Sequence, residues 1–137
     1  MYASLLTAFV LVSCGKEITF PSDEAARIVG TWQWIESTGG IAGVTRTPAS
    51  TGESIRAIFT SKGTYQKYVN NQVEIDATYS MEEGPTIYST ELGNIMHYTG
   101  EAFAHSVVIS TMDTLLIREE CYDCFIHTFV RDSGTSN

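Results

Sequence analysis

The sequence predicts an all-β protein, an eight-stranded antiparallel up-and-down β-barrel with a short helical turn before its first strand. Three observations predict it. From residue 30 onward, apolar side chains recur at every second position, which is typical of half-buried strands. Turn signals separate these runs in series, and no long helical pattern interrupts them. Eight short strands joined by hairpins can close into a barrel with room for one small ligand, although a two-sheet sandwich is the alternative.

The composition indicates one globular domain. The chain has 137 residues, 43% of them apolar, and its formal net charge is −8. This length holds one hydrophobic core, so we predict a single barrel domain over residues 22–132 and a flexible tail over 133–137. The eight lysines and arginines form no basic run, which argues against a nucleic-acid partner.

The N-terminus has the pattern of a targeting segment. The largely apolar run of nine residues from Ser4 to Val12 is too short to span a bilayer but matches the core of a signal peptide. Residues 11–15 (LVSCG) resemble a bacterial lipobox. That resemblance implies a signal peptide over 1–13, a lipid anchor on Cys14 and a tether over 14–21. An ordinary cleaved signal peptide and a retained anchor are the alternatives.

The elements follow from capping, alternation and turn residues. Ser22 or Asp23 can cap a helical turn that ends at Gly30. Strands are predicted over Thr31–Thr38, Ser54–Thr60, Thr64–Val69, Gln72–Met81, Thr86–Ser89, Ser106–Ser110, Asp113–Glu119 and Cys124–Arg131. Tight turns are predicted at Ser61–Gly63, Asn70–Asn71 and Glu82–Pro85.

Closure of the barrel predicts one specific contact. In an antiparallel barrel with an even number of strands, the first and last strands lie side by side and run in opposite directions. Trp32, near the start of the first strand, therefore lies across from Arg131, near the end of the last. A guanidinium over an indole is a favourable cation–π pair.

These residues carry a family resemblance. The sequence Gly30-Thr31-Trp32 after a helical turn, together with Arg131 at the end of the last strand, resembles the lipocalin signature. With the lipobox, the chain is similar over most of residues 28–131 to small lipocalin-like lipoproteins of bacteria. The resemblance implies a barrel closed at Gly30, Trp32 and Arg131, with a pocket opening at the opposite end.

The opposite end is expected to form the mouth. Two connectors, 39–52 and 90–105, are much longer than hairpin turns, and alternation places both at the end away from Arg131. The first is interpreted as a flexible lid or as a solvated connector. Acidic residues dominate the segments at this end, which disfavours anionic ligands; a solvated acidic rim is the alternative. They are Glu53, Glu91, Glu101, Glu119, Glu120 and Asp123, against Arg46.

A ligand would meet an apolar interior with a few polar groups. Inward parity is predicted for Trp34, Ile55, Phe59, Tyr65, Val73, Ile75, Tyr79, Val107, Ile109, Leu115, Ile117 and Phe129. A barrel of this size can also be filled completely by such side chains. If a cavity exists, we expect Trp34, Tyr65, Tyr79 and His127 to orient the ligand, because each joins an apolar body to a polar tip.

Cys121 and Cys124 are the cysteines that remain if Cys14 is lipidated. A four-residue turn brings its ends close enough for a disulfide, so we predict one here; a reduced pair and a redox-active pair are the alternatives. With His97 and His105 they could form a zinc set, but the spacing is poor and we predict no metal. No GxSxG, HExxH or P-loop motif is present, so we predict no enzyme activity and no cofactor.

The leading hypothesis is a non-catalytic protein, lipid-anchored in the bacterial cell envelope, that binds or carries a small apolar molecule. One alternative is a filled barrel that binds or inhibits an envelope protein through its long loops. Another is a thiol or metal protein centred on Cys121 and Cys124.

Overall fold

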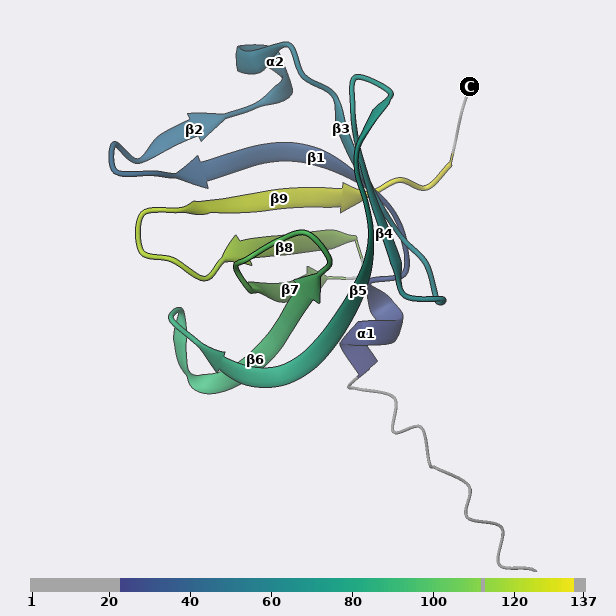
Figure 1. The fold of residues 1–137 in the computed structure, drawn as a ribbon. Coiled ribbons are helices and arrows are strands. Elements are labelled where there is room, and N and C mark those ends of the chain that lie inside the picture. The colour runs from purple at the N-terminus through teal and green to yellow at the C-terminus, as the bar shows by residue number, and fades with distance from the viewer. Residues whose placement is uncertain (1–22, 112, 135–137) are drawn as a thin grey trace, which may run out of the picture.

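The structure, a computed structural model, describes residues 23–111 and 113–134. It forms one antiparallel sheet in the order β2-β1-β3-β4-β5-β6-β7-β8-β9, and β1 also pairs with β9 (Figure 1). That pairing closes eight strands into a barrel, which confirms the predicted fold class, and β2 lies outside the ring as a ninth strand. The elements are α1 (Asp23–Arg27), β1 (Gly30–Gly39), β2 (Val44–Arg46), α2 (Pro48–Thr51), β3 (Ile55–Phe59), β4 (Thr64–Val69), β5 (Gln72–Thr86), β6 (Ser89–Tyr98), β7 (His105–Thr111), β8 (Thr114–Glu119) and β9 (Phe125–Arg131).

The N-terminal predictions fall on residues that the structure does not describe. The signal peptide, Cys14 and the tether lie within 1–22, outside the described residues. The predicted helical turn is present as α1. Among the described residues, no helix has the length and apolar character needed to cross a membrane.

The closed end of the barrel is built around Arg131. The register places Trp32 of β1 opposite Arg131 of β9, and the guanidinium carbon lies 4.1 Å from the centroid of the indole. The same guanidinium donates to the carbonyl oxygens of Val29 (3.1 Å) and Arg27 (2.7 Å). A Cβ at Gly30 would lie 2.6 Å from Arg131 Nη1, and φ there is +141°. A residue without a side chain is therefore required where the chain enters β1.

The predicted hairpin at Glu82–Pro85 is wrong. β5 continues through these residues to Thr86, and β6 occupies most of the segment predicted as a long loop. Gly84 pairs with Gly93, and a Cβ at Gly84 would lie 3.2 Å from the side chain of Ile95. Pro85 lies at a register shift between Gly84 and Thr86. The hydrogen-bond ladder between the strands is interrupted there, so the lack of an N–H on proline breaks no pairing bond.

The turn between β5 and β6 lies instead at Ile87 and Tyr88, and contacts distant in sequence hold it in place. Ile87 N donates to Glu120 Oε2 (2.8 Å), and the Tyr88 hydroxyl donates to the carbonyl oxygen of Glu119 (2.7 Å). The hairpin is therefore fastened to the end of β8.

The first long connector has regular structure. It contains β2, which pairs with the end of β1, and α2, in which Thr47 and Ser50 form a capping box. All residues of β2 are exposed and α2 buries none. This connector therefore lies on the outside of the ring.

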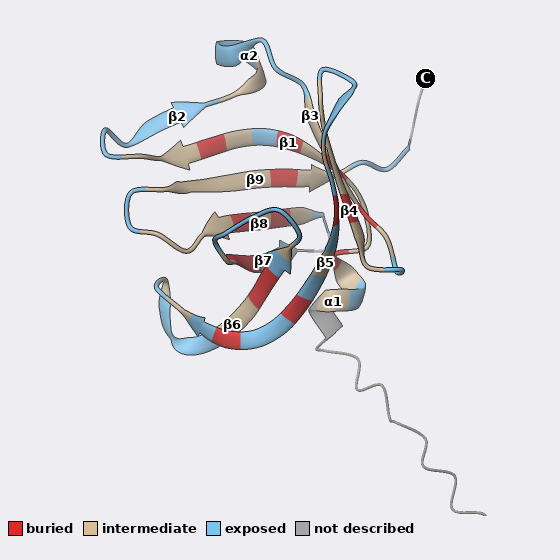
Figure 2. Cartoon of the chain, viewed as in Figure 1, coloured by how far each residue is buried: buried red, intermediate tan, exposed pale blue. Residues whose placement is uncertain are grey.

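Two of the register shifts in the sheet change which side chains face the interior. Figure 2 marks the buried residues along the strands. A shift between Trp34 and Glu36 in β1 turns Ser37 inward, where it is buried. A second shift, between Lys67 and Tyr68 in β4, places Val73 opposite Tyr68 on the outer face. Val73 is 53% exposed, so the prediction that it faces the interior is wrong.

Candidate functional site

The barrel encloses a cavity of about 510 Å³. Its walls combine aromatic and aliphatic side chains with histidines, carboxylates and two cations. The lining residues are Trp34, Ser37, Arg46, Glu53, Ile55, Tyr65, Lys67, Ile75, Met96, Tyr98, Glu101, Phe103, His105, Ile117, Glu119, Cys121, Cys124, Phe125, His127 and Phe129.

Three of the four residues predicted to orient a ligand line this cavity: Trp34, Tyr65 and His127. Tyr79 does not. Its hydroxyl donates to the carbonyl oxygen of Thr60 (3.2 Å), in the turn between β3 and β4, and its ring packs edge-on against Phe59. Tyr79 is therefore part of the packing beneath the cavity.

The mouth is formed where the connectors meet, as the sequence predicts. Arg46 and Glu53 come from the β1–β3 connector, Glu101 and Phe103 from the β6–β7 connector, and the two cysteines from the β8–β9 loop. Of the predicted acidic rim, Glu53, Glu101 and Glu119 line the cavity. The others do not: Glu120 holds the β5–β6 turn, and Glu91 and Asp123 are exposed.

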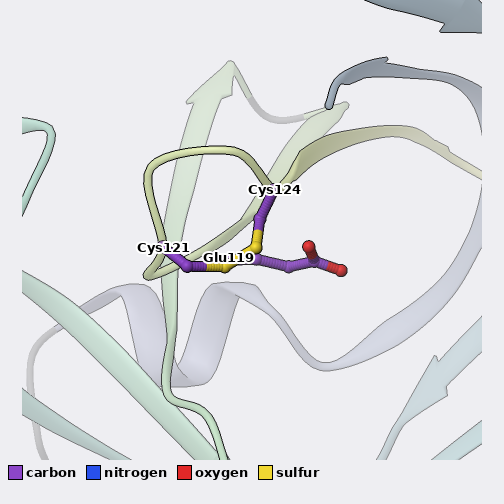
Figure 3. Close-up of side chains that lie close together, drawn as sticks. All are labelled: Glu119, Cys121 and Cys124. Atoms are coloured by element: carbon purple, nitrogen blue, oxygen red, sulfur yellow. A yellow bond between two sulfur atoms is a disulfide. The ribbon is translucent and has the colours of Figure 1, made fainter. Parts of the chain in front are cut away.

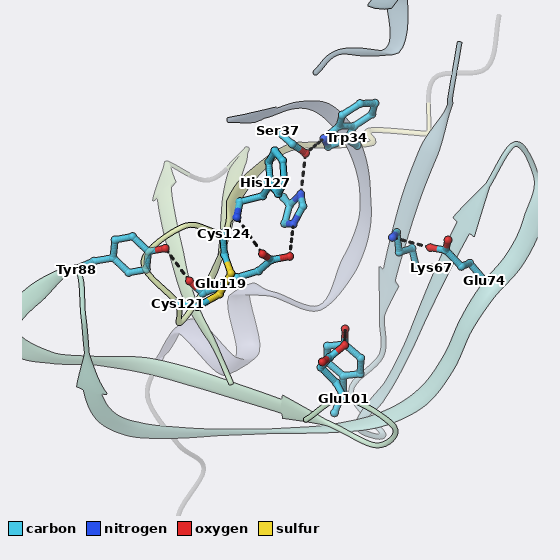
Figure 4. A network of polar contacts seen from close by, with 12 residues as sticks. Trp34, Ser37, Lys67, Glu74, Tyr88, Glu101, Glu119, Cys121, Cys124 and His127 are labelled. Atoms are coloured by element: carbon cyan, nitrogen blue, oxygen red, sulfur yellow. Dashed lines mark hydrogen bonds and ion pairs between the residues drawn. A yellow bond between two sulfur atoms is a disulfide. The ribbon is translucent and has the colours of Figure 1, made fainter. Parts of the chain in front are cut away.

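A chain of hydrogen bonds runs along one wall of the cavity (Figure 4). Trp34 Nε1 donates to Ser37 Oγ (2.8 Å), and Ser37 Oγ lies 2.7 Å from His127 Nδ1. On the other side of the imidazole, His127 Nε2 lies 3.2 Å from Glu119 Oε1. The remaining carboxylate oxygen, Glu119 Oε2, accepts from Phe125 N at 2.9 Å.

The direction of each bond in this chain follows from its end groups. An indole N–H only donates and a carboxylate only accepts. A neutral His127 therefore carries its proton on Nε2, which donates to Glu119, and its Nδ1 accepts the hydroxyl proton of Ser37. Burial lowers the pKa of His127 and favours this neutral form, although the hydrogen bond to Glu119 opposes the effect.

A second histidine, His105, lies on β7, beside the strand that carries Glu119. Its register partner is Glu119, its ring stacks on Tyr98 (centroids 5.3 Å apart), and it is 7% exposed. Burial lowers the pKa of His105, against the opposing charges of Glu119 and Glu101. Its Nδ1 is buried and has no hydrogen-bond partner among the described residues.

Glu101 and Tyr98 interact at the mouth. The Tyr98 hydroxyl donates to Glu101 Oε2 (3.2 Å), and the backbone N–H of Ala102 donates to Glu101 Oε1 (3.0 Å). Desolvation opposes ionisation of Glu101, but these bonds and that from Phe103 N outweigh it and lower its pKa. Burial raises the pKa of Tyr98, and the charge of Glu101 adds to the effect. At neutral pH this pair is therefore a carboxylate and a neutral phenol.

Cys121 and Cys124 form a disulfide with Cα atoms 5.4 Å apart, and Glu119 lies beside them (Figure 3). The carboxylate and the two sulfurs lie within 4.8 Å of one another. Sulfurs bonded to each other cannot serve as thiolate ligands, so this cluster offers a metal only the carboxylate. His97, part of the zinc set considered from the sequence, is exposed and bonds to Glu82 (3.1 Å).

Sequence reasoning missed Ser37 and Lys67 and assigned no binding role to His105 or Glu119. Ser37 faces inward only because of the shift in β1, and Lys67 faces inward because it pairs with Ala57 and Ile75. The sequence contained a signal that Ser37 faces inward. Strict alternation from Trp32 and Trp34 would place the charged residue Glu36 in the core, which indicates a shift in this strand.

The chain matches no protein family, no curated protein and no solved structure.

Proposed function

We propose that this chain is a non-catalytic binding protein, lipid-anchored in the bacterial cell envelope, that holds or carries a small, mainly apolar molecule in its barrel. The observation that carries the proposal is the cavity of about 510 Å³, which has the size of a small-molecule site. A small eight-stranded barrel can fill its interior with side chains, and this one leaves space bordered by Trp34, Ile75, Met96 and Phe129. Polar groups on one wall would fix the orientation of a bound molecule.

The hydrogen-bonded chain Ser37–His127–Glu119 fits a binding role better than a catalytic one. Its residue types are those of a nucleophile, a base and an orienting acid. However, Ser37 Oγ accepts the indole N–H of Trp34, which withdraws electron density from the oxygen. Hydrolysis of 4-nitrophenyl butyrate should therefore be no faster with the wild type than with Ser37→Ala. A rate at least tenfold higher with the wild type would contradict the non-catalytic assignment.

Intrinsic fluorescence tests the binding proposal. Trp34 lines the cavity, whereas Trp32 is buried at the closed end, so a ligand should quench mainly Trp34. Titration of the protein with a panel of lipophilic compounds should give saturable quenching that Trp34→Phe largely removes. Native mass spectrometry of protein extracted from its own membrane should show a co-purifying small molecule. Failure of both measurements would overturn the proposal.

The anchor is tested separately, because Cys14 lies outside the described residues. Cells fed a labelled fatty acid should label the wild-type protein but not Cys14→Ser, and the variant should leave the membrane fraction. The double variant Cys121→Ser/Cys124→Ser is the control and should still be labelled. Labelling of Cys14→Ser equal to that of the wild type would refute the anchor.

A second function, binding of an envelope protein, is favoured by exposed apolar side chains on two connectors. Ile41, between β1 and β2, is 92% exposed, and Tyr122, between the two cysteines, is 91% exposed. A photo-crosslinking residue at position 122 should then give one dominant adduct in intact envelopes, which Ile41→Ser should weaken. Absence of a discrete adduct would exclude this function.

A further inference from the structure

The cavity contains a carboxylate without a cationic side-chain partner. Glu119 has a side chain 29% exposed, and its two oxygens accept from His127 Nε2 and Phe125 N. In the described part of the chain, no lysine or arginine nitrogen lies within 4.0 Å of it. Its histidine partner has a pKa lowered by burial and is not a full counter-charge at neutral pH. A carboxylate has about four acceptor sites, so Glu119 retains acceptor capacity.

The two cations that line the cavity are held by other groups. Lys67 Nζ forms an ion pair with Glu74 (2.6 Å), and the guanidinium of Arg46 lies over the ring of Phe125, 4.8 Å from its centroid. Three carboxylates line the same space, those of Glu53, Glu101 and Glu119. Three carboxylates thus face two cations, one of which is already paired with Glu74, so the acids are in excess and the potential inside favours a positive ligand.

The walls around Glu119 suit a cation with an apolar body. Aromatic rings of Trp34, Tyr65 and Tyr98 line the cavity, and their faces attract a positive group. His105, opposite Glu119 in the register of β7 and β8, is almost fully buried and has an unpartnered ring nitrogen. Because Nδ1 is itself buried, the nitrogen that can meet a ligand is Nε2, which accepts an N–H when the proton of the neutral imidazole resides on Nδ1.

We propose that the molecule bound in this cavity is an amphipathic amine. Its ammonium group donates to Glu119 and lies beside His105, and its aromatic or branched apolar body contacts Trp34, Tyr65 and Phe129. This inference rests on the proposed binding function and specifies its ligand class. It excludes fatty acids and other anions as preferred ligands.

A matched set of ligands separates the head group from the body. Calorimetric titration of the mature protein at pH 7.5 with 4-phenylbutylamine, 4-phenylbutanol and 4-phenylbutyrate compares a cation, a neutral molecule and an anion of similar body. The amine should bind most tightly and the carboxylate most weakly. Glu119→Gln should weaken binding of the amine by about tenfold to a hundredfold, since a charge-assisted hydrogen bond is lost. Binding of the alcohol should change by less than about threefold.

Two further variants complete the design. Glu91→Gln removes the same charge from an exposed position on β6 and should leave all three affinities unchanged. His105→Phe keeps a ring against Tyr98 but removes the ring nitrogens, and it should weaken the amine more than the alcohol. It serves as the second test if Glu119→Gln, checked by circular dichroism, does not fold.

The outcomes distinguish this inference from the binding proposal. Equal affinity for amine and alcohol, or an unchanged amine affinity in both folded site variants, overturns the amine assignment and leaves the binding proposal standing. No binding by any of the three, together with no quenching across the lipophilic panel, overturns both.

Discussion

Replacing Arg131 with methionine tests the physical basis of barrel closure. Methionine keeps an apolar stem over the indole of Trp32 but removes the guanidinium. That group makes a cation–π contact with Trp32 at 4.1 Å and donates hydrogen bonds to the carbonyl oxygens of Val29 and Arg27 at 3.1 and 2.7 Å. The variant therefore breaks the link between the end of β9 and the segment that joins α1 to β1.

The expected loss can be worked out from these contacts. A hydrogen bond from a charged group contributes about 1.5–3 kcal/mol and a cation–π pair about 0.5–2 kcal/mol. Arg27 and Val29 are half-buried, so water can replace part of each bond and the lower ends of these ranges apply. The free energy of unfolding should fall by about 3.5 kcal/mol, a large share of the about 5–15 kcal/mol typical of a domain.

Urea denaturation followed by far-ultraviolet circular dichroism measures this loss. Arg131→Lys retains the charge but not the planar fork that reaches both carbonyls, and should lose about 2 kcal/mol. Lys62→Met, in the exposed turn between β3 and β4, is the control and should change stability by less than about 0.5 kcal/mol. The reasoning is refuted if Arg131→Met unfolds within about 1 kcal/mol of the wild type.

Three further predictions concern pH, the disulfide and the register of β5. Burial lowers the pKa of His105 and His127 below 6.5 in the folded protein, so on acidification the unfolded chain binds protons before the folded one does. The free energy of unfolding should therefore fall as pH drops from about 6.5 to 5, and replacing both histidines with glutamine should flatten this pH dependence. An alkylating reagent should label Cys121 and Cys124 only after reduction, as read by mass spectrometry. The double variant Cys121→Ser/Cys124→Ser should lose at most about 2 kcal/mol of unfolding free energy in urea denaturation. Val73→Thr should change stability by less than about 0.5 kcal/mol because this side chain is 53% exposed, and a loss above about 1 kcal/mol would contradict the outward register.

Alternation and strand order were sufficient to predict the barrel and its closure. The pairing of Trp32 with Arg131 follows from topology alone, because any even-stranded antiparallel ring joins the start of its first strand to the end of its last. The disulfide followed from local spacing, since Cys121 and Cys124 are only three residues apart. Features set by connectivity or by a few neighbouring residues were therefore accessible to sequence reasoning.

The β5–β6 hairpin was not accessible, because the deciding contacts are non-local. Gly84 and Pro85 have the composition of a turn, yet here they allow close packing of Ile95 and a register shift inside a long strand. The true turn, at Ile87 and Tyr88, contains no glycine, proline, asparagine or aspartate and is held by Glu120, more than thirty positions along the chain.

The candidate site was predicted in part for a related reason. Trp34, Tyr65 and His127 were found because simple alternation holds up to Trp34 and around the other two, whereas Ser37 faces the cavity only after the shift that follows Trp34. Tyr79 has the right parity but lies at the wrong height in the barrel. The position of a residue along the barrel axis depends on how neighbouring strands are staggered, which the alternation pattern of the sequence does not encode.

The connector that holds β2 and α2 has a practical consequence. It contributes no strand to the ring, α2 buries no residue, and the side chains of β2 are exposed. Foreign sequence inserted in place of residues 41–51 should therefore leave closure at Arg131 intact while changing what surrounds the opening. The barrel would then serve as an engineering scaffold, as an antibody framework does for its hypervariable loops. Variants with new binding specificity could be selected by randomising this one inserted segment.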